Sequence, residues 1–197
     1  MEKAQRLTEE QGRLLDMLAR NTLNAKFGRE PNVDAGKKLR RQWAAPALQA
    51  PAGVFVTLKM DGRLRGCIGT LSGDEPLVQG VCTYAEHAAL HDPRFAPLTA
   101  AELDRTTIEV SALTPPQPLA YTDVNDLLAR LRPGVDGVIL RKGISSATFL
   151  PQVWEQLPRP EDFLSQLCLK AGLAADEWRR GRLSIETYQV QYFEESA

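Results

Sequence analysis

The sequence predicts an α+β fold, with an antiparallel sheet flanked by helices and a smaller α+β subdomain. Three observations favour it: an Asp61-Gly62 pair between two strand-like segments, alternating helical and strand-like patterns, and the proline-rich stretch PPQP at 115–118. Asp-Gly is typical of the two-residue turns that join antiparallel strands. The 197 residues suit a single domain over 1–197, with a candidate subdomain at about 119–155.

Local patterns predict each element before PPQP. Thr8 and Gln11 form a capping-box pattern ahead of a leucine stripe, which predicts a helix over 9–26. Thr99 and Glu102 repeat that pattern before a short helix. The further predicted elements are a short helix at about 37–43, strands over 54–60 and 63–71, a helix over 74–91, a short helix over 100–104 and a strand over 106–113.

After PPQP, Asp123 is a candidate cap for a helix over 124–132, and two strands flank Lys142-Gly143. An amphipathic helix over 161–171 ends at Gly172, with four residues predicted to face inward: Phe163, Leu164, Leu167 and Cys168. A final strand covers 183–193. The main sheet is predicted to contain strands 54–60, 63–71, 106–113 and 183–193.

The register of the first hairpin decides which side chains share a face. A two-residue turn at Asp61-Gly62 places Leu58 opposite Arg65 and Val56 opposite Cys67. Arg65 and Cys67 then share a face with those apolar residues. Because a charged group on an apolar face needs a partner, we expect Arg65 to pair with Glu109 on a neighbouring strand.

The string LRGCIGT at 64–70 resembles the signature of the AMMECR family, whose microbial members are called AmmeMemoRadiSam system protein A. Five more segments are similar to family segments in the same order: GVFVTLK (53–59), DPRF (92–95), IEVSAL (108–113), LPQVWE (150–155) and LCLKAGL (167–173). The chain departs from the family where it has KGISSATF at 142–149, so no role is assigned to those residues.

The resemblance implies a two-part α+β fold and no agreed reaction. It also implies association with Memo-like and radical-SAM proteins, which microbial genomes place beside such proteins. Three functions therefore stay open. The chain is an enzyme or enzyme component acting on a small anionic substrate, a non-catalytic partner module for those two proteins, or a nucleic-acid-binding protein that uses the basic segment 26–65.

Cys67 is the first candidate site residue, because a thiol beside an arginine suits a nucleophile or a ligand contact; the alternative is a small buried side chain between glycines. Glu109 is the candidate general base. Arg65 and Arg94 are candidate substrate-binding cations, although Arg94 could instead bond helix-end carbonyls. Two glycines, Gly66 and Gly69, permit close approach of a ligand or of the backbone.

The net charge is −1, but residues 26–65 carry nine Lys or Arg against three acids. That asymmetry can mark an anionic partner, but a solvated helix or loop face is the favoured interpretation. The segment has few aromatic residues for base stacking, which makes nucleic-acid binding the weakest of the three functions.

The remaining patterns exclude several classes of site. His87 and His91 are one helical turn apart but lack a third ligand, so we predict no metal site and no cofactor. Phosphate-binding loop motifs are absent from the sequence. Three scattered cysteines, no signal-peptide pattern and no long apolar run lead us to expect a reduced, cytoplasmic protein without a membrane span.

Overall fold

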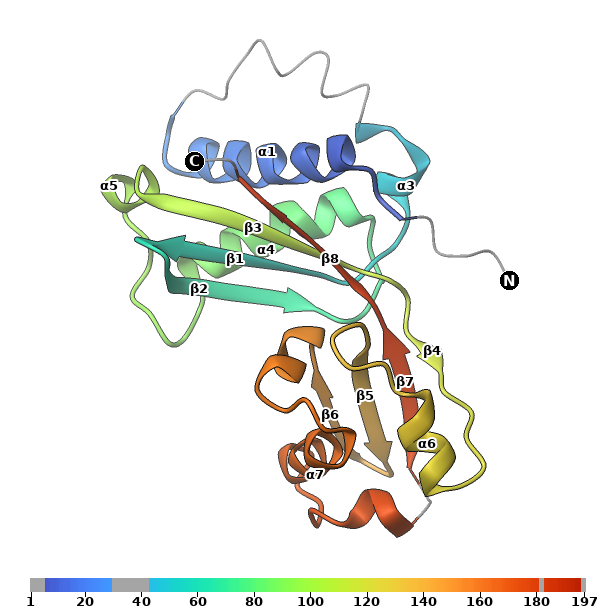
Figure 1. The fold of residues 1–197 in the computed structure, drawn as a ribbon. Helices are drawn as coiled ribbons and strands as arrows, with labels where there is room; N and C mark the ends of the chain where they lie inside the picture. Colours follow the sequence, from blue (N-terminus) through green and yellow to red (C-terminus); the bar gives the residue numbers. More distant parts are fainter. Residues whose placement is uncertain (1–5, 30–42, 181–182, 196–197) are drawn as a thin grey trace. The chain divides into compact units, whose positions relative to one another are not determined.

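The structure is a computed structural model that describes residues 6–29, 43–180 and 183–195. The chain forms two compact units, coloured along the sequence in Figure 1. The first comprises Met1–Pro115 and Gln191–Ala197, and the second Pro116–Val190. Most of the helix predicted at about 37–43 lies outside the described residues.

The first unit contains a four-stranded sheet in the order β2-β1-β3-β8. Its strands are β1 (Val54–Met60), β2 (Arg63–Thr70), β3 (Thr106–Leu113) and β8 (Val190–Glu194). β1 pairs antiparallel with both β2 and β3. Asp61 and Gly62 both have positive φ, at 52° and 74°, as a type I′ turn requires. The predicted hairpin and antiparallel sheet are therefore confirmed.

Helices cover one face of this sheet, where alternate side chains of β1 and β3 are buried (Figure 1). They are α1 (Glu9–Lys26) and α4 (Leu77–Leu90), with two short helices, α3 (Pro46–Gln49) and α5 (Ala100–Leu103). Both predicted capping boxes are present. The side chains of Thr8 and Thr99 accept from the backbone amides of Gln11 and Glu102, whose side chains accept from the amides of the two threonines. The sequence did not predict α3.

The second unit has its own sheet, in the order β4-β7-β5-β6. Its strands are β4 (Gln117–Pro118), β5 (Gly137–Lys142), β6 (Ser145–Phe149) and β7 (Ser184–Tyr188). Its helical segments are α6 (Val124–Arg130), η1 (Pro151–Glu155), α7 (Pro160–Lys170) and η2 (Glu177–Arg180). The four residues predicted to face inward from α7 are buried. A separate core surrounds Phe163, whose ring stacks on Trp154 at 3.7 Å.

The predicted final strand over 183–193 is wrong as a single element. It divides at Gln189 into β7, which belongs to the second sheet, and β8, which belongs to the first. Both halves have strand-like sequences, and only the pairing partners distinguish them. Among the described residues, we find no helix with the length and apolarity that a membrane crossing needs.

Candidate functional site

The candidate site lies on β2, which is an edge strand of the first sheet. Met60 faces Arg63 as predicted, and Lys59 faces Leu64, but the register then shifts so that Leu58 faces Gly66. Arg65 is therefore the extra residue of a β-bulge. The predicted pairs of Leu58 with Arg65 and Val56 with Cys67 are wrong, since one inserted residue reverses which face each later side chain takes.

The bulge places Cys67 opposite Thr57, on the sheet face that the helices do not cover. Val56 and Leu58 point to the other face and are fully buried. The Thr57 hydroxyl donates to the Cys67 sulfur at 3.3 Å, and the cysteine is half-buried. The thiol is thus not enclosed by aliphatic side chains, and it has a polar neighbour.

Residues after α4 fix the backbone of Cys67. The Cys67 amide donates to Asp92 Oδ2 at 2.8 Å, and Arg94 Nη2 donates to the Cys67 carbonyl oxygen at 3.1 Å. Asp92 also accepts from Arg94 Nε at 2.9 Å and Nη2 at 2.6 Å. These bonds satisfy the outer backbone groups of an edge strand, which would otherwise be open to pairing with another chain.

The Asp92–Arg94 pair has unequal burial. The Asp92 side chain is 2% exposed and the Arg94 side chain 53% exposed. Bonds from Arg94, supported by the Cys67 amide, hold the pKa of Asp92 well below its usual range, so this carboxylate is ionised. The guanidinium is therefore anchored on one side, while its third nitrogen, Nη1, has no hydrogen-bond partner within the described part of the chain.

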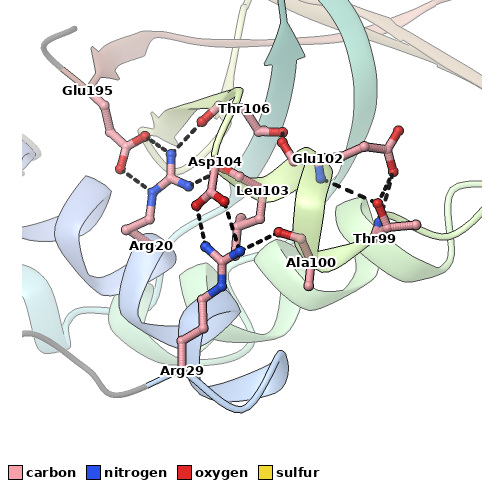
Figure 2. A network of polar contacts seen from close by, with 9 residues as sticks. All are labelled: Arg20, Arg29, Thr99, Ala100, Glu102, Leu103, Asp104, Thr106 and Glu195. Carbon is pink, nitrogen blue, oxygen red and sulfur yellow. Dashed lines mark hydrogen bonds and ion pairs between the residues drawn. The ribbon is translucent and has the colours of Figure 1, made fainter.

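Arg65 does not pair with Glu109 as predicted. Its Nε and Nη2 donate to the two carboxylate oxygens of Glu102 at 3.1 and 3.2 Å. Bonds from Arg65, then from Thr99, lower the pKa of Glu102 to about 2. Figure 2 shows the Thr99–Glu102 contacts of this capping box. Glu109 pairs with Thr57, so it lies on the sheet face opposite to the one predicted for Arg65 and could not be its neighbour in the predicted register either.

Glu109 is instead bound by Lys59, whose Nζ lies 2.8 Å from Glu109 Oε2 and 3.0 Å from Glu194 Oε1. Glu109 pairs with Thr57 on β1, which in turn pairs with Cys67 on β2. The three side chains form a row across the sheet, with Cys67 and Glu109 about 9.6 Å apart along it. Direct proton transfer between the thiol and this carboxylate would therefore need a bridging group.

Both candidate glycines lie in tightly packed positions. A Cβ on Gly66 would lie 2.2 Å from the carbonyl oxygen of Ala88 on α4, and one on Gly69 would lie 2.2 Å from that of Val54 on β1. Close approach of the backbone explains both residues without a ligand. Their role in substrate binding stays a prediction.

Sequence reasoning missed three residues of this arrangement: Thr57, Asp92 and Glu102. The Asp-Pro-Arg order after a helix hints at a carboxylate anchoring its neighbouring arginine. The sequence predicts Glu102 only as part of a capping box with Thr99. The structure adds a second interaction, the ion pair between Glu102 and Arg65. Thr57 could not be found without the bulge, because its contact with Cys67 depends on the shifted register.

Two hollows lie in the first unit. One of about 680 Å³ is formed around α3 and the end of β3, and none of the six predicted site residues lines it. The other, of about 430 Å³, surrounds the hairpin turn and is lined by Arg65 and its neighbours: Met60, Asp61, Arg63 and Leu64.

The rings of His87 and His91 pack edge to face at 5.5 Å, and no group of three metal-ligating side chains gathers among the described residues.

The basic segment 26–65 is only partly described, because the KKLRR run at 37–41 lies outside the described residues. Among the cations of this segment that the structure describes, four are bound to carboxylates: Lys26 to Glu86, Arg29 to Asp104, Lys59 to Glu109 and Glu194, and Arg65 to Glu102. Paired cations contribute less to binding an external polyanion.

The chain matches the AMMECR1 family over residues 17–193. A protein of Thermofilum pendens is 36% identical over 206 residues, which cover 97% of this chain and 92% of that relative. A protein of Methanopyrus kandleri is 37% identical over 199 residues, with 97% and 91% covered. The crystal structure of an uncharacterised protein of Pyrococcus horikoshii superposes with a TM-score of 0.78 at 34% identity, covering 96% of this chain and 94% of that one. The resemblance expected from LRGCIGT is confirmed: the chain belongs to the AMMECR1 family.

Proposed function

We propose that this protein is an enzyme component that binds a small anionic ligand beside Cys67. The observation that carries the proposal is the double anchoring of Cys67: Asp92 and Arg94 hold its backbone on both sides. The half-buried thiol of Cys67 and the half-exposed guanidinium of Arg94 are thus both held at one position of β2. Fixed placement of binding groups is what a recognition site requires.

Arg94, rather than Arg65, is the proposed anion contact. The Arg65 side chain is 12% exposed and both of its carboxylate-facing nitrogens are bound to Glu102. Arg94 shares its charge with Asp92, but its side chain is half-exposed and its Nη1 makes no hydrogen bond to the described residues. A guanidinium held by a buried carboxylate is preorganised to accept an anion on its free edge.

A component role fits this site better than self-sufficient cysteine catalysis. Glu109, the candidate base, forms an ion pair with Lys59 and lies on β3, two strands away from Cys67 on β2. Nucleophilic chemistry at the thiol would therefore use a base from the substrate or from a partner protein. Memo-like and radical-SAM proteins are the proposed partners, and the alternative role is a partner module without chemistry of its own. Nucleic-acid binding gains no support from the paired cations of 26–65.

Competing alkylation by iodoacetate and iodoacetamide tests the anion site. The two reagents are similar in size and differ in charge, and peptide mass spectrometry measures each cysteine separately. We expect Cys67 to prefer iodoacetate, relative to free cysteine, by about fivefold, because a nearby guanidinium attracts the anion by about 1 kcal/mol. Arg94→Gln should abolish the preference and Arg94→Lys should retain most of it.

Arg130→Gln is the matched control, since Arg130 is also half-exposed and paired with a neighbouring aspartate, Asp126, but lies in the second unit. It should leave the reagent preference of Cys67 unchanged. The proposal fails if wild type and Arg94→Gln show the same preference, or if Cys67 reacts no faster than the buried Cys168.

A further inference from the structure

One buried carboxyl group in the first unit is incompletely bonded. Asp16 lies in the middle of α1 and is 4% exposed. Its Oδ1 atom has no hydrogen-bond partner within the part of the chain that the structure describes. Burying a charge without a partner is costly, so a carboxyl group in such a position favours its neutral form. Asp16 takes no part in the hydrogen bonds described at Cys67.

The face of α1 that carries Asp16 is directed at the C-terminal strand. Gly12, Asp16 and Arg20 are spaced by four residues and share one face of the helix. A Cβ on Gly12 would lie 1.9 Å from the Phe193 ring, so β8 packs directly on the helix there. One turn beyond Asp16, Arg20 binds both carboxylate oxygens of Glu195.

The charged groups around Asp16 are carboxylates, which would not stabilise a negative charge on its side chain. Glu194 and Glu195 approach from β8 and the residue after it, and Glu109 from β3. Arg20, one turn further along α1, is bound to Glu195 and to the carbonyl oxygens of Leu103 and Thr106, as Figure 2 shows. Burial, followed by these three carboxylates, raises the pKa of Asp16 to about 7.

The other neighbouring elements offer Asp16 no free cation among the described residues. Lys59 on β1 is bound to Glu109 and Glu194. On the side of α1 that faces α4, Lys26 is bound to Glu86, and Cys82 lies beside Thr22 of α1. The negative charge of an ionised Asp16 would therefore lie near other carboxylates, without an unpaired cation among the described residues to balance it.

We propose that the contact between α1 and β8 is a proton-dependent latch, which holds while the Asp16 carboxyl is protonated and loosens when it ionises. Opening of β8 would expose Asp16 to water and let it ionise with an ordinary acidity. The Arg20–Glu195 pair opposes opening at one end of the contact, and the Gly12–Phe193 packing opposes it at the other. Protonation of Asp16 thus sets how often the strand opens.

Hydrogen exchange of the β8 amides tests the latch. The open form binds a proton at Asp16 only below about pH 4 and the closed form below about pH 7. Protection factors, corrected for intrinsic rates, should therefore fall about tenfold per pH unit between about pH 5 and pH 7 and level off above. Amides of β7, in the second unit, provide the internal reference and should show no such slope.

Two variants separate the carboxyl from general stability. Asp16→Asn should remove the slope in β8, whatever its effect on overall stability, while Glu9→Gln on the exposed first turn of α1 should keep it. The titration of the Asp16 carboxyl carbon, followed by NMR in the wild-type protein, measures the acidity directly. The latch is refuted if that carbon titrates near its ordinary value, or if Asp16→Asn keeps the wild-type slope.

Discussion

At the scale of single residues, side-chain partners depend on strand register and on contacts between elements. The prediction that Arg65 needs a carboxylate follows from its position on a strand, and the carboxylate exists. Its identity, Glu102 rather than Glu109, depends on the packing of α5 beside Arg65 and on the β1–β3 register, which places Glu109 opposite Thr57. The bulge at Arg65 exchanges Val56 for Thr57 as the neighbour of Cys67 and so turns the thiol away from the core.

Gly66 offers a test of packing at this scale. Gly66→Ala places a methyl group 2.2 Å from the Ala88 carbonyl oxygen, a backbone atom that cannot rotate aside. We expect the free energy of unfolding, measured in urea, to fall by about 1–3 kcal/mol. Arg63→Ala, on the exposed start of the same strand, should change it by less than about 0.5 kcal/mol. A neutral Gly66→Ala would mean that β2 and α4 are less closely packed than the structure indicates.

At the scale of elements, Arg20 joins α1 to two regions that are distant from it in the sequence, residues 103–106 and Glu195. From α1 it binds Glu195 after β8, the Leu103 carbonyl oxygen in α5 and the Thr106 carbonyl oxygen at the start of β3 (Figure 2). Glu195 in turn accepts from the Ile108 amide at 3.0 Å. One guanidinium thus satisfies backbone groups that helix and strand ends leave unpaired.

Arg20→Met should therefore be costly although the side chain keeps much of its apolar length. We expect a loss of about 3 kcal/mol in the free energy of unfolding, because a partly buried carboxylate and two carbonyl groups lose their donor. Arg13→Met is the comparison, as Arg13 on the same helix is 75% exposed and its contact with Glu9 is 3.7 Å long. Equal losses in the two variants would contradict a structural role for Arg20.

At the scale of the whole molecule, the chain leaves the first unit after Pro115 and returns at Gln191. The second unit has its own sheet and its own buried core around Phe163, Trp154 and Trp178. Its residues are contiguous in the sequence, whereas the first unit needs the returning β8 to complete its sheet. The two units should consequently differ in whether they fold as isolated chains.

A fragment of residues 116–190 should fold alone. We expect a cooperative thermal transition followed by the fluorescence of Trp154 and Trp178, which are both buried in that unit. A fragment of residues 1–115, which lacks β8 and Glu195, should unfold at a lower temperature than the first unit of the intact protein. A gradual, non-cooperative melt of 116–190 would show that its core depends on the rest of the chain.

The sequence by itself determined helices α1, α4, α5, α6 and α7, the hairpin turn, both capping boxes, the inward face of α7 and membership of the AMMECR1 family. These features depend on neighbours within a few residues or on a continuous motif. Only the tertiary structure decided the bulge at Arg65, the anchoring of Cys67 by Asp92 and Arg94, the division of the last strand between two sheets and the isolation of Asp16. Strand pairing and burial join residues far apart in the chain, so a shift of one residue changes every later partner without altering the local pattern.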